Sequence, residues 1–218
     1  GLYGTAFFVA LPLVLIAVGA VPLARAVRRY ARHVRFARPR APRAAWWTYP
    51  IVALGLLGVG MLYFSILTPN NVAFDSRWQH LALAEHYVAE GAVQRFPEGY
   101  YVGTSPHLAS FIYTWAFLLP RGTLFDFVEL SAHLEFTAFL WTLVGVVAVV
   151  RRLVPRSRAS VAWAARFAFP GVFLYDSSLC AGADHMAALF AAPIYCLLIR
   201  AYDDISPRVS ALLAVVLA

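Results

Sequence analysis

Two long uncharged runs, separated by a run of arginines, constrain the fold of this chain most strongly. Residues 3–24 and residues 44–68 contain no charged side chain, and an α-helix needs about 20 apolar residues to cross a bilayer. Between them, eight arginines lie from Arg25 to Arg43 without an acidic residue. Short loops this basic stay in the cytoplasm. The first helix is therefore predicted to run from outside to inside and the second to return, so that the chain leaves the membrane on the outer side near Thr68.

The composition agrees with an integral membrane protein and excludes an ordinary soluble domain. Hydrophobic residues make up 61% of the 218 residues and charged residues only 13%, whereas soluble domains have about 45–50% apolar and about 25% charged residues. The net charge of +7 comes from 18 arginines that are clustered along the chain, so it indicates membrane topology rather than nucleic-acid binding. Cys180 and Cys196 have neither the spacing of a metal site nor that of a disulfide framework.

The middle of the chain contains two further apolar runs, residues 105–120 and residues 127–150. If both crossed the membrane, the four arginines of residues 151–158 would lie outside, which contradicts the positive-inside rule. Residues 105–120 number only 16 and are bounded by prolines, which favours an interfacial or re-entrant helix. We therefore expect only residues 127–150 to span.

The remaining chain is predicted to cross the membrane three more times. Residues 159–175 run from inside to outside, residues 176–185 form an outer loop, residues 186–199 return, and a last span begins near Val209. The expected fold is an all-α, polytopic transmembrane helical bundle with juxtamembrane helices on the outer side.

Two regions follow from this assignment. Residues 1–46 form an additional transmembrane helix and a basic cytoplasmic loop, and residues 47–218 form a transmembrane module with outer loops at 68–127 and 176–185. The chain starts without Met and stops inside the apolar run "VSALLAVVLA", so we expect it to be a fragment of a longer protein.

The first outer loop carries an unusual density of ionisable groups in "NNVAFDSRWQHLALAEHYVAEG", residues 70–91. Residues 75–90 contain no proline or glycine, which predicts a helix at the outer surface. At about 100° per residue, Asp75, Gln79 and His86 share one face of it. One interpretation is a surface helix with solvated charges. The other is a site at the depth of a lipid head group, because Asp75 directly follows the second span.

The second outer loop contains "GADH", in which Asp184 and His185 open a helix that returns into the membrane. An acid in this position stabilises a helix N-terminus by about 0.3–1 kcal/mol, so a capping role is one interpretation. The other is catalytic, because two acids on separate loops can act as a general base and a second carboxylate that positions it or binds a cation. In that case, we expect the carboxylates of Asp75 and Asp184 to lie within roughly 12 Å of each other.

The order of these motifs resembles that of the bacterial polyprenyl-phosphate-dependent glycosyltransferases of GT-C fold, the group of protein mannosyltransferases and the aminoarabinose transferase of lipid A. The similar segments are, in order, "DSRWQHLALAEHYVAEGAV", "SPHLASFIY", "VVRRLVP" and "AGADHMAALF". They extend over about residues 47–200. The chain departs from the pattern at Ser76, where many relatives carry a second acid.

The resemblance implies transfer of a sugar, with inversion, from a polyprenyl-phosphate donor to a lipid, glycan or protein acceptor outside a bacterial inner membrane. It implies that Asp75 is the general base and Asp184 the second acid. The residues that it offers for holding the donor phosphate or the acceptor are Arg77, His80, His107 and His185. Tyr101 is a candidate for lining an acceptor groove. Use of a divalent cation varies in this group, so a cation site stays open, and no nucleic-acid partner is expected.

Other interpretations remain for single residues and for the function. An interfacial or packing role is an alternative for each histidine. Glu135 is expected to pair with Arg166 within the membrane, with a substrate role or snorkelling as alternatives. A transporter would place its polar groups at the bilayer midplane, often in repeated halves, and a non-catalytic assembly protein would need only the spans.

Overall fold

The computed structural model describes residues 3–36, 46–67, 76–96, 99, 108–119, 125–154, 157, 160–165 and 181–217. Within these ranges the protein is all-helical, as predicted. The helices are α1 (Thr5–Phe36), α2 (Thr48–Ile66), the π-helix η2 (Ser76–Leu81), α3 (Ala82–Glu90), α4 (Leu108–Leu118), α5 (Phe127–Leu153), α6 (Val161–Ala165), α8 (Asp184–Asp203) and α9 (Pro207–Leu217).

Four of the described helices are long and apolar enough to cross a membrane. They are α2, α5, α8 and residues 5–29 of α1. The helix α4 has 11 residues, which at 1.5 Å per residue is about 17 Å and well short of the about 30 Å hydrocarbon core. The described part of the run at 105–120 is thus a short apolar helix, and its non-spanning placement stays a prediction. The predicted span at 159–175 is described only over α6, and α9 extends over 11 residues.

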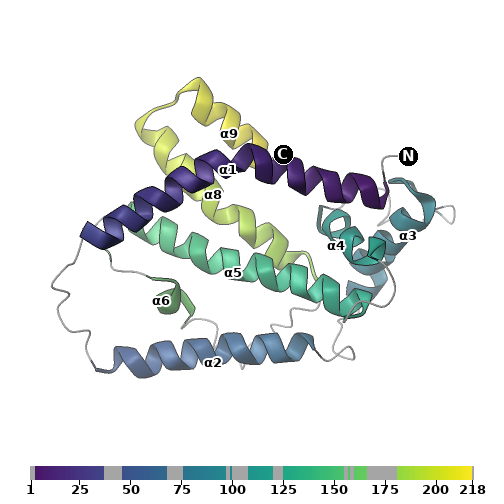
Figure 1. The fold of residues 1–218 in the computed structure, drawn as a ribbon, viewed down its shortest axis with the longest axis horizontal. Helices are drawn as coiled ribbons and strands as arrows, with labels where there is room; N and C mark the ends of the chain where they lie inside the picture. The colour runs from purple at the N-terminus through teal and green to yellow at the C-terminus, as the bar shows by residue number, and fades with distance from the viewer. Residues whose placement is uncertain are drawn as a thin grey trace.

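The arginines of α1 and α5 lie at one end of the bundle, and the acids of α3 and of the first turns of α5 and α8 lie at the other. In Figure 1, α1 ends, α2 begins and α5 ends on the left, whereas α3, α4 and the starts of α1 and α5 lie on the right. The left end carries the arginines of α1 and of the last turn of α5. The right end carries the acids of α3 and of the first turns of α5 and α8. Asp203, in the last turn of α8, lies 3.9 Å from Arg152 at the basic end. The predicted orientation in the membrane stays a prediction.

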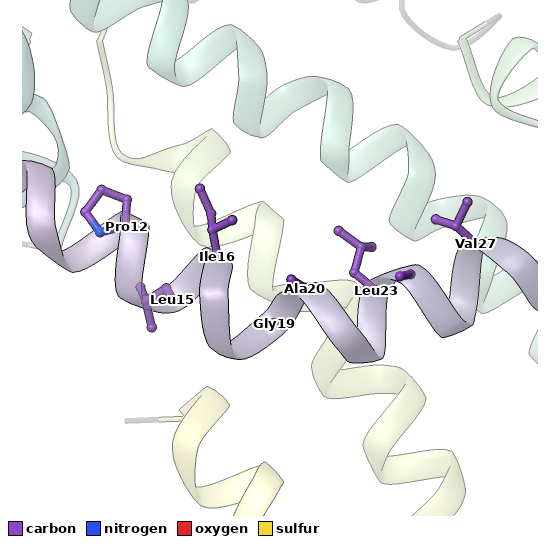
Figure 2. A pocket seen from close by; sticks show the side chains of 8 residues that line it. Pro12, Leu15, Ile16, Gly19, Ala20, Leu23 and Val27 are labelled. Atoms are coloured by element: carbon purple, nitrogen blue, oxygen red, sulfur yellow. The ribbon is translucent and has the colours of Figure 1, made fainter.

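The first helix is longer than the sequence suggests. The expected span stops at residue 24, but α1 continues to Phe36 through the first half of the basic segment. Arginine is a good helix former, and after Pro22 no proline or glycine interrupts the run. Between Val9 and Val27 most large apolar side chains are exposed. One face forms an open apolar groove of about 730 Å³ along residues 12–27 (Figure 2).

The segment at 76–90 is not the single α-helix that we expected. It begins as the π-helix η2 and continues as α3, which Gly91 ends with a φ of 64°. A left-handed residue after the last turn is a common helix terminator, and glycine adopts it without steric cost. π-Helical turns are rare and are often found at functional sites. The change of winding alters the direction in which the side chains before Ala82 point.

The core of the bundle is the contact between α5 and α8. A Cβ added to Gly145 of α5 would lie 2.5 Å from the Cβ of Ala192 on α8, so the two helices approach each other closely only because position 145 has no side chain. At the right-hand end, a buried cluster joins α8 to η2, α3, α4 and α5. Its buried members are Leu81, Ala84, Ala109, Tyr113, Ala138, Ala181 and Met186.

Candidate functional site

The π-helix η2 directs two polar side chains into the protein. Ser76 is 1% exposed and His80 is 8% exposed, although a surface helix with solvated charges was one of the two interpretations of this segment. Arg77 and Trp78, between them, are exposed. The winding of η2 therefore separates an inward face with Ser76 and His80 from an outward face with the guanidinium group of Arg77.

His80 lies on the wall of a small cavity between η2, α4 and the start of α8. The volume of the cavity is about 180 Å³, below the roughly 300–1,000 Å³ typical of sites for small molecules. Its other lining residues are Leu108, Ala109, Ala183, Met186, Ala187 and Phe190. The two outer-loop regions that the sequence singles out thus meet at one place, because His80 comes from the first loop and Ala183 and Met186 flank Asp184 and His185 of the second.

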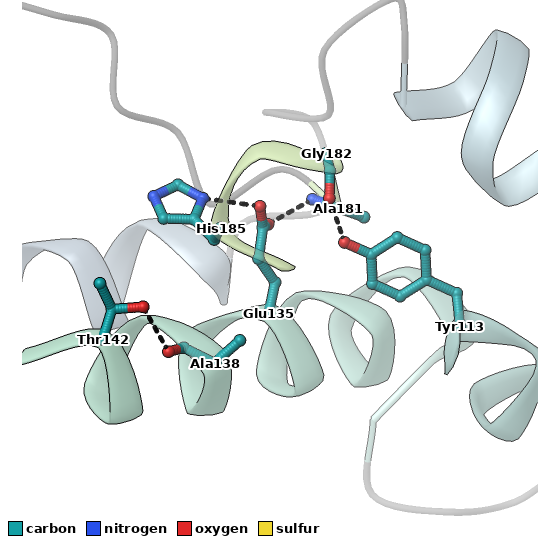
Figure 3. Close-up of polar contacts among 7 residues, drawn as sticks. All are labelled: Tyr113, Glu135, Ala138, Thr142, Ala181, Gly182 and His185. Atoms are coloured by element: carbon teal, nitrogen blue, oxygen red, sulfur yellow. Dashed lines mark hydrogen bonds and ion pairs between the residues drawn. The ribbon is translucent and has the colours of Figure 1, made fainter. Parts of the chain in front are cut away.

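Glu135 is the most deeply buried charged side chain in the described part of the chain, with 1% of its surface exposed. It lies between the second and third turns of α5 and accepts two hydrogen bonds across the α5–α8 contact (Figure 3). Its Oε2 accepts the backbone N–H of Ala181 at 2.8 Å. Its Oε1 lies 2.8 Å from Nδ1 of His185. A buried carboxylate is tolerated when it is paired and hydrogen-bonded, and Glu135 meets both conditions.

The turn that precedes α8 is held from a second side by Tyr113. This side chain of α4 is fully buried, and its hydroxyl donates a hydrogen bond to the carbonyl oxygen of Gly182. Ala181 has a φ of 61°, a left-handed conformation that non-glycine residues adopt rarely. Two polar contacts from α4 and α5 therefore hold this turn in an uncommon backbone conformation, and with it the first turn of α8.

His185 and the cavity lie on different sides of α8. At about 100° per residue, residues 183, 186, 187 and 190 share a face, and His185 points roughly the opposite way. There it contacts Glu135, and its ring meets the ring of Phe139 edge to face with 5.9 Å between centroids. The side chain of His185 is 27% exposed. The structure therefore brings His80 and the start of α8 together, but it does not direct His80 and His185 into one pocket.

The other predicted site residues are either exposed or outside the described ranges. Asp184 is exposed in the first turn of α8, and the residue before it, Ala183, makes no side-chain cap. Asp75, Tyr101 and His107 lie outside the described residues, so the distance between Asp75 and Asp184 is not described either. Their predicted roles, like that of Asp184, stay predictions.

The contact between Glu135 and His185 is the functional feature that sequence reasoning missed. Both residues were candidates, but Glu135 was predicted to pair with Arg166, which lies outside the described residues. A signal was present, because Glu135 and His185 lie near the outer-end starts of two long apolar helices and hence at similar depth. Depth alone does not select a partner, since Arg166 was also an intramembrane candidate.

The sequence did not decide whether the protein binds a divalent cation. In the described part of the chain, no three His, Cys, Asp or Glu side chains gather in a way that could hold a metal ion. The pairing of Glu135 with His185 involves two such groups and uses Nδ1 of the ring.

Comparison of the chain with protein-family models, with curated proteins and with solved structures found no match.

Proposed function

We propose that this membrane protein is a glycosyltransferase of GT-C type that moves a sugar from a polyprenyl-phosphate donor to an acceptor on the extracytoplasmic face, with inversion. The observation that supports this proposal is the meeting of the two outer-loop regions. His80 of the first region and Ala183 and Met186 of the second line one cavity. A glycosyltransferase whose acids come from two loops needs those loops to meet. A scaffold that needs only its spans does not.

In this proposal, Asp75 is the general base and Asp184 the second acid. The residue after Asp75, Ser76, is buried. Inverting transfer requires a group that takes the proton of the acceptor hydroxyl while the phosphate leaves from the opposite face of the sugar. A positioned base contributes about 10²–10⁴-fold to such a rate.

The test is transfer from a panel of radiolabelled polyprenyl-phosphate sugars in membranes that contain the wild type or the Asp75→Asn variant. Asparagine keeps the shape of the side chain but cannot take up the proton, so transfer should fall by about 10²–10⁴-fold at unchanged protein abundance. Glu85→Gln is the matched control, because Glu85 is an exposed acid on α3 at the same end of the bundle. Equal transfer by wild type and Asp75→Asn would reject the base assignment, and no transfer from any donor would favour the assembly protein.

The orientation in the membrane has its own test. Single cysteines near Arg35 and Arg156 should be shielded from a membrane-impermeant thiol reagent in intact cells, whereas cysteines near Glu98 and Ser178 should react. The reason is that the arginine clusters are predicted to remain in the cytoplasm. Labelling near Arg156 from outside would overturn the assignment of residues 105–120 as non-spanning.

A further inference from the structure

The carboxylate of Glu135 determines which nitrogen of His185 is available to another molecule. An ionised carboxylate only accepts hydrogen bonds, and Oε2 of Glu135 already accepts the N–H of Ala181. With Glu135 ionised, Nδ1 of His185, 2.8 Å from Oε1, therefore donates its N–H to Glu135. The other ring nitrogen, Nε2, lies on the side of the ring away from Glu135 (Figure 3).

The ring is also held in orientation. Phe139, one turn along α5 from Glu135, meets the imidazole edge to face at 87°, while the turn at Ala181 and Gly182 is tied to α5 and α4. Carboxylates that receive a histidine N–H in this manner set the orientation of the ring for a ligand on the opposite nitrogen. The side chain of His185 remains 27% exposed, so the ring is not fully enclosed by the bundle.

We propose that Glu135 is a positioning residue that holds the imidazole of His185 so that Nε2–H donates a hydrogen bond to an anionic oxygen of the donor's phosphate. This inference rests on the proposed function and assigns a residue to one part of its substrate. Buried carboxylates are ordinarily paired with a cation, and a protonated imidazole at position 185 would supply it. An imidazolium donates from both nitrogens, and a phosphate oxygen is the strongest acceptor on the proposed donor.

The rival explanation is that the pair only fastens α8 to α5. The variant His185→Asn separates the two explanations, because the asparagine amide can still donate to Glu135 from near the position of Nδ1 but has no group at the position of Nε2. A fastening role predicts unchanged donor binding in this variant. A positioning role predicts the loss of one hydrogen bond to a charged group, which weakens binding by about tenfold or more.

The experiment measures binding of a long-chain polyprenyl monophosphate to the full-length protein in lipid nanodiscs, together with the KM for the sugar-linked donor. The variants are His185→Asn, Glu135→Gln and the double variant. Glu129→Gln is the control, because Glu129 is a partly exposed acid on the same helix whose capping bond a glutamine can also make. Parallel nanodiscs with added phosphatidic acid, and samples with inorganic phosphate, distinguish the donor's phosphate from membrane phospholipid and from free phosphate.

We expect the dissociation constant and the KM for the donor to rise about tenfold or more in both single variants, with a smaller change in kcat and with binding by Glu129→Gln unchanged. The double variant should bind no worse than His185→Asn, because Glu135 acts through that ring. Wild-type binding by His185→Asn would overturn the inference. A further loss in the double variant would also overturn it, because Glu135 would then act by another route. Equal competition by phosphatidic acid would assign the phosphate to membrane lipid and reject the donor.

The proposed function and this inference can fail separately. If the wild type transfers no sugar but binds the polyprenyl monophosphate through Nε2 of His185, the assignment of transfer fails and the phosphate contact stands. If the wild type transfers sugar with a KM for the donor that none of the variants changes, the phosphate contact fails alone. If the wild type neither binds nor transfers, both are wrong.

Discussion

The helix α1 and the helices of the α5–α8 pair are all apolar enough to cross a membrane but have opposite surroundings. Between Val9 and Val27, α1 presents most of its large side chains outward, and its described ring contacts with the rest of the protein are at its start. There Tyr3 and Phe8 pack against rings of Tyr87 and Phe111. By contrast, α5 and α8 are in contact at Gly145 and Ala192 and share the buried pair of Glu135 and His185.

The difference shows that hydrophobicity does not identify the partner of a membrane helix. Lipid tails are as apolar as leucine, so helices associate through close packing at small residues and through polar contacts. The α5–α8 pair has both features. Small residues are also present on α1, but a Cβ added to Gly19 would have no neighbour within 4 Å. A small residue therefore permits close packing but does not ensure it. Gly145 of α5 packs against α8, whereas Gly19 of α1 has no described neighbour.

The largest expected effect comes from removing the buried charge. Glu135→Ala leaves the N–H of Ala181 and the ring of His185 without their acceptor, and breaking a buried pair on one side costs about 3–5 kcal/mol. Leu15→Ala on α1 should change stability by less than about 0.5 kcal/mol, because its side chain is 62% exposed. Thermal unfolding in detergent, followed by the loss of helical signal, measures both. Equal stability of the two variants would contradict the contrast between these helices.

A glycine pair provides the next test of the same contrast. Gly145→Ala places a methyl group 2.5 Å from the Cβ of Ala192, and such overpacking typically costs about 1–3 kcal/mol. Gly19→Ala on α1 meets open space and should be neutral. The double variant Gly145→Ala with Ala192→Gly should recover most of the stability, because the removed methyl group makes room for the added one. Failure of this rescue would show that another neighbour makes position 145 sensitive.

Substitution of Tyr3, which contacts α4 at the start of α1, should have a smaller effect on stability. The hydroxyl of Tyr3 donates a hydrogen bond to Oγ1 of Thr114 at 3.4 Å, so Tyr3→Phe should weaken the docking of α1 by about 0.5–1 kcal/mol. Tyr49→Phe, on an exposed part of α2, is the control. Protection of the α1 start from amide hydrogen exchange should fall only in the first variant. An equal fall in both would show that the contact with Thr114 contributes nothing.

The smallest effect is expected at alkaline pH and at the same contact. Burial raises the pKa of Tyr3, with the hydrogen bond to Thr114 opposing part of the increase, and burial also raises the pKa of Tyr87. These pKa values are higher in the folded protein than the ordinary value of 10.0. The two protonated tyrosines therefore contribute their full stabilisation of the folded state below pH 10.0. It is lost as the pH rises from there through the folded pKa values. Hydrogen exchange at the start of α1 should therefore accelerate in that pH range by more than its intrinsic pH dependence. This additional acceleration should be smaller in the double variant Tyr3→Phe, Tyr87→Phe.

Much of the architecture could be predicted from the sequence, whereas little of the candidate site could. The runs at 44–68 and 127–150 became α2 and α5 within a few residues, and the short helix at 108–118 was expected not to span. The end of α1 was misplaced by 12 residues, because a charge pattern marks where a helix leaves the bilayer and not where its hydrogen bonds stop. The burial of His80 was missed because it depends on how η2 packs beside α4 and α8, whose residues line the same cavity.

The sequence by itself determined which segments are apolar enough for a membrane and at which end of the bundle their charges gather. Hydrophobicity and charge are properties of short stretches, and they act on a helix whatever its neighbours are. Only the tertiary structure decided that Glu135 meets Ala181 and His185, 46 and 50 residues away along the chain, and that Tyr113 meets Gly182, 69 residues away. Such contacts depend on how α4, α5 and α8 pack. Several donors at the same depth could form a hydrogen bond with a buried carboxylate, and the packing determines which of them lies within reach.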